Sequence, residues 1–496
     1  MITLIKNAKN FPQRTAVKSH NKSYDYGDVL KASENMALFL LEGRKDLQEE
    51  RVAFIVPPGF EYVSIQWGIW RAGGIAVPLC VKHPLSSISY VLEDTDASFL
   101  IFSKEFERLI EPLKNKSGIK FIPSQDVKKQ KGILPDIILD RRAMILYTSG
   151  TTGSPKGVVT THKNIEAQII SLITSWEWKK TDHILNVLPL HHTHGIINVL
   201  SCALWSGACC EFIPEFNPEE VFNVFNKKEV NVFMAVPTIY YQLIAYWDQL
   251  PETDQQKIAA NLKKFRLMVS GSAALPVSVM EKWEQISSHK LLERYGMTEI
   301  GMAISNPYRG ERKAGHIGQA LPKVQVRITD EQNKPVDQGI PGEIQVKGPN
   351  VFKEYWNKPQ ATRDAFTSDG WFKTGDIAIF ENSSYKILGR NSVDIIKSGG
   401  YKISALEIEE VLRSHPNIKD CGVVGIPDVE WGEIIAASLV LTNKNNVVIS
   451  VQQLKDWLKD KLPGYKIPRK YLFQEELPRN VMGKVTKHEL KKMFQI

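Results

Sequence analysis

The stretch YTSGTTGSPKG, residues 147–157, follows the apolar run AMIL at residues 143–146. Its small hydroxyl residues, three glycines and one lysine can present backbone N–H groups, hydroxyls and a positive charge to phosphate oxygens. It is not a Walker loop, which requires G-x-x-x-x-G-K-[ST]. Pro155 stands where that motif has its second glycine, and Lys156 is followed by glycine. The stretch therefore predicts a phosphate-binding loop of another kind.

Around this loop, apolar and β-branched runs alternate with helix-like segments. The expected strands lie within residues 51–59, 97–103, 183–190, 230–238 and 265–272, and the clearest helices within residues 64–74 and 278–289. Such alternation is typical of α/β proteins with largely parallel sheets. We therefore expect an α/β fold class built from layered α/β subdomains.

A chain of 496 residues is too long to fold around a single hydrophobic core, because domains average roughly 150 residues. From about residue 317 the sequence changes to short alternating strands, which predicts a β-rich subdomain over residues 317–390. Residues 391–496 alternate helices and strands and predict a small α+β domain that acts as a mobile lid. Residues 1–390 would then form the large N-terminal domain.

The overall composition restricts the classes of partner. The net charge of +8 is modest, and no block of Lys and Arg suggests a nucleic-acid-binding arm. No run of about 18 apolar residues predicts a membrane span. We expect neither a nucleic-acid nor a membrane partner, and the sequence leaves the oligomeric state open.

The cysteines indicate the compartment. The five cysteines include no C-x-x-C pair, and their odd number argues against a disulfide framework. This pattern favours a reducing compartment. The start of the chain lacks an apolar segment of signal-peptide length. We expect a cytoplasmic protein, with the mitochondrial matrix as the alternative if a transit peptide is missing from this sequence.

The loop at residues 148–157 resembles the signature loop of the adenylate-forming superfamily, which includes acyl-CoA synthetases, peptide-synthetase adenylation domains and luciferases. Further motifs of that superfamily follow in its order: ERYGMTE at residues 293–299, WFKTGDIA at 371–378, GR at 389–390 and LPRNVMGKV at 477–485. Each motif alone is weak. Together they span most of the chain, and the sequence is similar to this superfamily throughout.

The resemblance implies how ATP and Mg²⁺ would bind. Tyr295 would stack near the adenine, Thr298 would contact the α-phosphate, and Glu299 would hold Mg²⁺. Asp376 would accept both ribose hydroxyls, and Arg390 would add a second ribose contact. The resemblance also assigns nucleotide, phosphate or coenzyme contacts to Thr148, Ser149, Gly150, Thr151, Thr152, Gly153, Lys156, Gly271, Ser272, Ala273, Arg294, Gly296, Met297, Ser398, Gly399 and Gly400, with Thr151 as a second metal contact.

The resemblance implies a two-step reaction with coenzyme A as co-substrate. A carboxylate attacks the α-phosphorus of ATP, and this step depends on positioning and charge stabilisation. Lys484 would bridge the carboxylate and the α-phosphate as charge builds up. The lid would then rotate at a hinge near Ser392, where relatives often have Asp or Lys, and withdraw Lys484. The loop at residues 398–404 would approach the site for thioester formation.

The acyl-binding residues resemble those of malonyl-CoA synthetases. The similarity lies in LPLHHTHG at residues 188–195, MAVPTIY, VSGSAALP, GPNVFKEYWNKP and SVDIIKSGGYK. His194 would gate the carboxylate pocket, and Arg294 stands where these enzymes bind the distal carboxylate of the diacid, a role that suits an arginine fork. Gln242 departs from the pattern, because the family has a basic residue there. We expect Arg266 to be structural.

The leading functional prediction is an ATP-dependent acid–thiol ligase. It would form malonyl-CoA or methylmalonyl-CoA through an acyl-adenylate and release AMP and pyrophosphate. Two alternatives stay open: a short- or medium-chain acyl-CoA synthetase, and a stand-alone adenylation enzyme that loads a carrier protein. Gln242 leaves the identity of the acid open, because an amide brings no charge to a second carboxylate.

Overall fold

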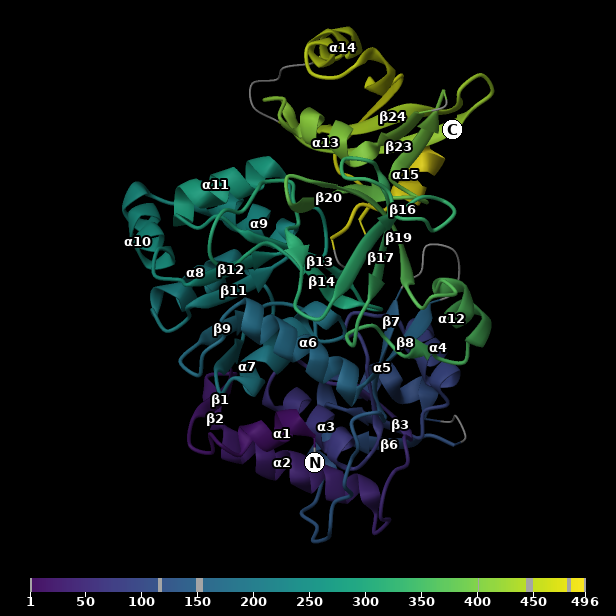
Figure 1. Cartoon of the computed structure of the whole chain (residues 1–496). Helices are drawn as coiled ribbons and strands as arrows, with labels where there is room; N and C mark the ends of the chain where they lie inside the picture. The colour runs from purple at the N-terminus through teal and green to yellow at the C-terminus, as the bar shows by residue number, and fades with distance from the viewer. Residues whose placement is uncertain are drawn as a thin grey trace.

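The computed structural model describes residues 2–114, 118–148, 155–399, 401–442, 449–479 and 483–494. Figure 1 shows an elongated molecule with the N-terminus at one end and the C-terminal residues at the other. We call residues 2–390 the body and residues 391–494 the C-terminal unit. The body contains two large sheets and one small sheet, and the C-terminal unit lies on top of it in this view.

The first large sheet has nine strands in the order β15-β14-β13-β12-β11-β9-β10-β1-β2. The strands from β13 to β1 are parallel, and antiparallel strands close both edges. Their bounds are β1 Thr15–Ser19, β2 Lys22–Asp25, β9 His183–Asn186, β10 Cys209–Phe212, β11 Val232–Ala235, β12 Leu267–Ser270, β13 Leu292–Met297, β14 Gly301–Ser305 and β15 Gln319–Ala320.

The second large sheet has seven strands in the order β18-β8-β7-β4-β3-β5-β6. Their bounds are β3 Arg51–Ile55, β4 Ile75–Pro78, β5 Phe99–Phe102, β6 Lys120–Pro123, β7 Arg142–Thr148, β8 Lys156–Thr161 and β18 Glu354–Tyr355. The strands from β7 to β6 are parallel, whereas β7 and β8 are antiparallel. The loop at residues 147–157 thus joins two strands of a hairpin, and not a strand to a helix N-terminus as a Walker loop does.

Helices between the two large sheets form the main core. Helix α3 (Phe60–Arg71) contacts both β1 and β4, and α6 (His162–Ser175) contacts both β14 and β8. Almost every side chain of α3 is buried, including Trp67 and Trp70, because sheets or helices cover it on all sides. Helix α2 (Tyr26–Leu41) packs along α3.

Further helices cover the outer parts of the body. Helices α8 (Pro218–Asn226), α9 (Pro237–Trp247), α10 (Glu252–Leu262) and α11 (Val277–Ser287) pack against one another beside the nine-stranded sheet (Figure 1). Helix α4 (Leu85–Thr95) contributes Ile88, Val91 and Leu92 to a separate core on the seven-stranded sheet. The shorter helices are α1 Thr3–Ala8, α5 Glu107–Ile110, α7 Cys202–Trp205, α12 Pro359–Ala365 and a π-helix at His194–Ser201.

The small sheet of the body is antiparallel and has four strands. They are β16 (Gln325–Thr329), β17 (Gly342–Lys347), β19 (Phe372–Glu381) and β20 (Ser384–Arg390). The last strand ends at Arg390, and residues 391–394 form a turn into the C-terminal unit. This sheet therefore lies directly before the expected hinge.

The C-terminal unit is a compact α+β assembly. Its sheet contains β21 (Ile395–Ser398), β22 (Tyr401–Ser404), β23 (Ile418–Asp428), β24 (Gly432–Leu441) and β25 (Lys470–Gln474). Two apolar clusters, one of them including residues of α13 (Ala405–Arg413) and α14 (Val451–Lys459), make up its core. The remaining helix, α15 (Lys487–Met493), contacts β23.

The predicted fold class is confirmed. All five runs expected as strands contain one, and both expected helical segments overlap helices. All five cysteines are free, as the absence of a disulfide framework predicted. Among the described residues, no helix combines the length and the apolar character that crossing a bilayer requires. One expectation is wrong: most of the lid loop at residues 398–404 belongs to strands β21 and β22, which pair as a hairpin.

Candidate active site

A carboxylate and a guanidinium face each other across two strands of the small sheet. Asp376 on β19 pairs with Arg390 on β20, and Arg390 Nε lies 3.7 Å from Asp376 Oδ1. Tyr295, on β13 of the nine-stranded sheet, donates its hydroxyl to Asp376 Oδ2 at 2.6 Å. Burial raises the pKa of Asp376, while Arg390 and the Tyr295 hydroxyl lower it. The three residues therefore come together from two sheets and fix one hydrogen-bond acceptor.

A second buried carboxylate lies in the turn between β13 and β14. Glu299 follows Thr298 in this turn, and its Oε1 accepts the Tyr355 hydroxyl at 2.8 Å. Burial raises the pKa of Glu299, and Tyr355, Arg390 and Lys156 oppose that rise. Lys156 Nζ lies 5.0 Å from the centre of the Tyr355 ring. Glu299 and the lysine of the glycine-rich loop thus share one neighbour, Tyr355.

The ends of the glycine-rich loop are anchored to the seven-stranded sheet. Thr148 pairs with Lys156 across β7 and β8, and Tyr90 of α4 donates its hydroxyl to the Pro155 carbonyl at 2.8 Å. Tyr147 donates to Asp94 Oδ2 at 2.5 Å. The predicted phosphate-binding residues Ser149, Gly150, Thr151, Thr152 and Gly153 lie outside the described residues. Their roles stay predictions, as does that of Gly400.

A cationic pocket follows the ends of β12 and β13. Arg294 is buried, with 3% of its surface exposed, and its Nη2 donates to Ser272 Oγ at 3.3 Å. The same hydroxyl lies 3.2 Å from His194 Nδ1. A Cβ at Gly271 would lie 2.5 Å from Arg294 Cζ, so glycine leaves the space that the guanidinium occupies. Ser272 itself has a φ of 71°, in the left-handed region.

The positive charge of this pocket has no carboxylate partner in the part of the chain that the structure describes. Among the described residues, no carboxylate oxygen lies within 4 Å of the Arg294 guanidinium. Burial lowers the pKa of Arg294 to about 9, so the group is still protonated at neutral pH. Burial also raises the pKa of the adjacent Glu293 to about 8, which leaves that group mostly uncharged. Arg294 therefore offers a buried, uncompensated charge.

His194 is neutral and lies beside this charge. Burial lowers its pKa well below the ordinary value, and Arg294 and His192 lower it further. Its Nε2, like Arg294 Nε, is buried without a hydrogen-bond partner among the described residues. Unpaired buried polar atoms are costly. Two such atoms in one pocket indicate a place for a polar ligand.

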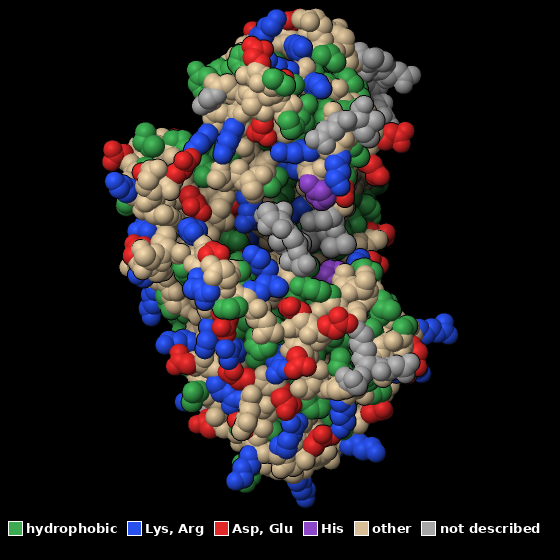
Figure 2. Space-filling view, turned by 90° about the vertical axis from the view of Figure 1, so that its right-hand side faces the viewer, with side chains coloured by type: hydrophobic (Ala, Val, Ile, Leu, Met, Phe, Trp, Pro, Cys, Tyr) green, Lys and Arg blue, Asp and Glu red, His purple; other side chains and the backbone are tan. Residues whose placement is uncertain are grey.

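Lys484 reaches the same region from the C-terminal unit. Its side chain keeps access to solvent, yet enough protein surrounds it that desolvation lowers its pKa. Arg294 and Arg390 lower that pKa further, and Asp376 raises it. These influences indicate that Lys484 lies near both the Arg294 pocket and the Asp376–Arg390 pair. Figure 2 shows Lys and Arg side chains around the hollow between the upper and lower parts of the molecule.

A few polar contacts connect the C-terminal unit to the body. Glu410 on α13 accepts the backbone N–H of Val277, at the start of α11, at 3.0 Å. Lys402 on β22 lies 2.7 Å from Glu331, beside β16. Gly483 lies against Thr238 of α9. These contacts hold the unit in the orientation that brings Lys484 to the site.

Several predicted residues lie elsewhere or contact only their own unit. Gly399 donates its backbone N–H to the Trp431 carbonyl at 2.9 Å, so the tip of the β21–β22 hairpin packs on the C-terminal unit itself. Ser398 is buried there too, and Ser392 lies exposed in the turn after Arg390. Arg266 is structural, as expected, because its Nη2 pairs with Asp182 at 2.5 Å. Of the remaining nucleotide-binding candidates, Ala273 follows β12, and Gly296 and Met297 form the end of β13.

Two residues of the site were not singled out from the sequence. Tyr355, within GPNVFKEYWNKP, holds Glu299, but an isolated tyrosine carries no signal for that contact. The second residue is His192. Burial is the main reason that the pKa of its imidazole falls to about 4, and the nearby Lys484 ammonium lowers this pKa further. The motif LPLHHTHG contains three histidines, and the sequence alone does not show which of their side chains points into the site.

A separate group of ionisable residues lies away from this site. His183, Glu211 and Glu229 bring their ligand atoms within 4.8 Å of one another, a spacing that a metal ion could use. Lys18 pairs with Glu229 there and already supplies a positive charge. We treat this group as an ion-pair cluster of the nine-stranded sheet.

This fold and this site define the class of protein. Residues 4–356 match the family of AMP-binding enzymes, and residues 407–484 match the C-terminal domain of AMP-binding enzymes. The chain belongs to this family. The family and the fold are those that the sequence motifs predicted.

Known relatives narrow the class further. The chain is 46% identical to the mitochondrial malonate–CoA ligase ACSF3 of Homo sapiens, over 90% of this chain and 84% of that protein. It superposes on ATP-bound MatB from Rhodopseudomonas palustris with a TM-score of 0.90 and 30% identity, over 100% of this chain and 99% of that chain. With apo MatB the TM-score is 0.82 at the same identity and the same coverage. The present arrangement is thus more similar to the ATP-bound form.

Proposed function

We propose that the chain is an acid–thiol ligase that joins malonate to coenzyme A, with ATP as the energy source. The observation that carries the proposal is the buried Arg294 guanidinium, which no carboxylate of the described residues neutralises. A diacid leaves one carboxylate free while the other reacts, and a guanidinium suits that distal group. The identity of 46% to a malonate–CoA ligase supports this choice of acid.

The first half-reaction forms an anhydride between the acid and AMP. A malonate carboxylate oxygen attacks the α-phosphorus, the bond to the β-phosphate oxygen breaks, and pyrophosphate leaves. Asp376 and Arg390 would hold the ribose, with Tyr295 under the adenine, and Thr298 would contact the α-phosphate. The Lys484 ammonium would lie between the two reacting anions, where it stabilises the charge that builds up in the transition state.

Mg²⁺ would reduce the repulsion between the triphosphate and the carboxylate. The residues fit such an ion, because Glu299 presents a buried carboxylate beside Lys156, and magnesium commonly takes one or two carboxylates together with substrate phosphates. Tyr355 orients Glu299 through its 2.8 Å hydrogen bond. Thr151 stays a proposed second contact.

The second half-reaction transfers the acyl group to sulfur. The coenzyme A thiol attacks the acyl carbon, the bond to the AMP oxygen breaks, and AMP leaves. We place the moving boundary after Arg390, between domains 1–390 and 391–496, with Ser392 in the exposed turn as the hinge. Rotation there would withdraw Lys484 and bring Ser398, Gly399 and Gly400 toward the thiol.

The position of Gln242 bears on the choice of diacid. Gln242 is exposed on α9, one turn after Thr238, which lies against Gly483. An amide there brings no charge, so Arg294 would bind the distal carboxylate without a second cation. Methylmalonate offers Arg294 the same distal carboxylate and is the second candidate substrate.

A panel of acids tests the proposal. The purified chain is given ATP, Mg²⁺, coenzyme A and one of malonate, methylmalonate, succinate, butyrate or octanoate, and pyrophosphate and thioester are measured. We expect kcat/KM for malonate to exceed that for butyrate by about tenfold or more. A preference for butyrate or octanoate would contradict the assignment. Transfer to a phosphopantetheinyl carrier protein but not to free coenzyme A would favour an adenylation module.

We also infer a reducing compartment. Five free cysteines, four of them buried, support this inference, and they leave both the cytoplasm and the mitochondrial matrix open. Fractionation of the source cells distinguishes the two. Recovery from an oxidising, secreted fraction would contradict both.

A further inference from the structure

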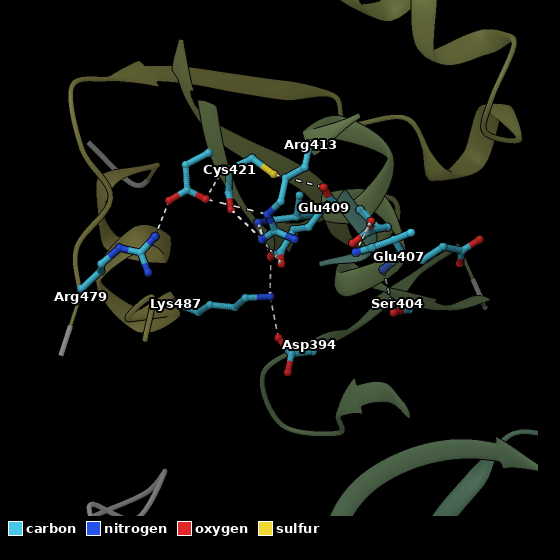
Figure 3. A network of polar contacts seen from close by, with 12 residues as sticks. Asp394, Ser404, Glu407, Glu409, Arg413, Cys421, Arg479 and Lys487 are labelled. Atoms are coloured by element: carbon cyan, nitrogen blue, oxygen red, sulfur yellow. Dashed lines mark hydrogen bonds and ion pairs between the residues drawn. The ribbon is translucent and has the colours of Figure 1, made fainter. Parts of the chain in front are cut away.

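Lys487 is a buried lysine that lies three residues after Lys484, at the start of α15. It is 9% exposed, and its Nζ lies 2.5 Å from Asp394 Oδ1 and 2.8 Å from Glu409 Oε1. Figure 3 shows the side chain extending from α15 to meet both carboxylates. A buried ammonium with two carboxylate partners is held firmly, because losing either partner would leave charge unpaired.

Glu409 is a fixed support for this ammonium. Its Oε1 also accepts the Val423 N–H at 2.9 Å, and its Oε2 accepts Arg413 Nη2 at 3.1 Å. Burial would raise the pKa of Glu409, but Lys487 and Arg413 outweigh burial and the pKa is lowered. Glu409 therefore stays ionised within the core of the C-terminal unit.

Asp394 connects Lys487 to the turn at the domain boundary. Its Oδ2 accepts the backbone N–H of Arg390 at 3.0 Å, and its own N–H donates to the Arg390 carbonyl at 2.7 Å. A Cβ at Gly389 would lie 2.4 Å from the Asp394 Cβ, so this close approach depends on glycine. One carboxylate thus binds the turn through one oxygen and Lys487 through the other.

Other contacts shape the loop that carries Lys484 without tying it to this turn. Thr486 donates its N–H to the Pro478 carbonyl at 2.8 Å, and Arg479 forms an isolated bridge with Val485. Both contacts close the loop on itself. The ion pair between Lys487 and Asp394 joins this segment to the turn after Arg390.

We propose that Lys487 is a positioning residue for the adenylate-forming half-reaction, acting through its ion pairs with Asp394 and Glu409. These pairs hold the segment of Lys484 at a fixed distance from Arg390, which contacts the same nucleotide. The inference rests on the proposed function only through the role of Lys484. Thioester formation, which proceeds with Lys484 withdrawn, depends on Lys487 much less.

The two half-reactions are measured separately in the full-length chain. Adenylate formation is followed by ATP–pyrophosphate exchange, using whichever acid of the panel activates the wild type, and thioester formation starts from the chemically prepared acyl-adenylate. For Lys487→Met we expect exchange to fall about tenfold or more and thioester formation to stay within about threefold. Lys487→Arg keeps the charge and is expected to restore about a third of the exchange rate.

Two further variants separate positioning from folding. Asp394→Asn keeps an acceptor for the Arg390 N–H but weakens the pair with Lys487, and we expect exchange to fall about fivefold with thioester formation nearly unchanged. Lys466→Met removes a comparable ion pair of the same unit, at 2.7 Å from Glu407, and should leave both half-reactions within about twofold. If Lys487→Met and Asp394→Asn each lower the rates of both half-reactions by the same factor, Lys487 contributes only to the stability of the fold. A wild type that activates another acid contradicts the choice of malonate and leaves this comparison intact.

Discussion

The body and the C-terminal unit hold their site residues by different means. In the body, Asp376 and Arg390 face each other on paired strands, and Tyr295 reaches Asp376 from another sheet. In the C-terminal unit, Lys484 lies in the loop that the Arg479–Val485 bridge closes, shortly before α15. The body therefore holds the proposed nucleotide and acid sites in a fixed geometry, whereas the proposed cation of the C-terminal unit reaches them only in one orientation of that unit.

The contacts between the two regions suit a unit that moves. The ion pair of Lys402 and Glu331 is exposed, with 59% and 74% of the side chains accessible, and exposed pairs contribute about 0–1 kcal/mol. Glu410 adds one hydrogen bond to the Val277 N–H. Such weak contacts leave alternative orientations close in free energy, which lid rotation between half-reactions requires.

Removing the cation of the C-terminal unit gives the largest expected effect. Lys484→Ala should lower ATP–pyrophosphate exchange by about a thousandfold, because charge stabilisation of this kind contributes several kcal/mol. Thioester formation from supplied acyl-adenylate should stay within about threefold, because the proposed rotation withdraws the ammonium before that step. If the Lys484→Ala variant keeps the rates of both half-reactions equally well, the role proposed for the cation of the C-terminal unit is wrong.

The acid pocket of the body is tested by removing its charge. Arg294→Leu should lower kcat/KM for malonate by about tenfold or more, which corresponds to about 1.4 kcal/mol. Butyrate, which has no distal carboxylate, is the matched control and should lose far less. Equal losses for the two acids would show that Arg294 supports the fold and not the substrate.

The ribose end of the body is tested at Asp376. Asp376→Ala removes the acceptor that Tyr295 and Arg390 hold in place, and we expect KM for ATP to rise about fivefold. Tyr295→Phe keeps the ring and loses the hydrogen bond, so its effect should be smaller. An unchanged KM for ATP in Asp376→Ala would argue against the ribose contact.

A smaller effect is expected from a substitution that shifts the Arg294 side chain without removing its charge. Gly271→Ala places a Cβ where the Arg294 guanidinium lies, at 2.5 Å from Cζ, and the flexible side chain must shift. We expect KM for malonate to rise about threefold with the thermal unfolding midpoint nearly unchanged. A large loss of stability with no change in KM would mean that the backbone moves instead of Arg294.

The pH dependence of the exchange reaction tests the surroundings of Lys484, where the C-terminal unit meets the body. Desolvation, Arg294 and Arg390 lower the pKa of Lys484 below 10.5, and Asp376 raises it. Because the protonated lysine is the active form, kcat/KM for ATP in the exchange reaction should fall as pH rises, with a midpoint below 10.5. Asp376→Asn removes the group that raises this pKa, so the fall should move to lower pH. A midpoint that moves up would contradict the geometry.

The sequence predicted the elements that local patterns specify. The strands at residues 183–190 and 265–272 were visible because parallel strands buried on both faces read as continuous apolar runs. The motif order also indicated Asp376, Arg390 and Lys484 as one site. The sequence did not predict that most of residues 398–404 belong to a hairpin. The glycines suggested a loop, and the pairing of β21 with β22 cannot be inferred from the residues of either strand alone.

The sequence by itself determined the fold class, the family and the chemical types of the site residues, since period and motif order are local properties of the chain. Only the tertiary structure decided which charges are neutralised. It left Arg294 without a carboxylate partner among the described residues, placed Tyr355 on Glu299, and paired Lys487 with Asp394 and Glu409. The physical reason is that burial and the distance between charges depend on segments far apart in sequence, and these two quantities fix protonation and electrostatic strength.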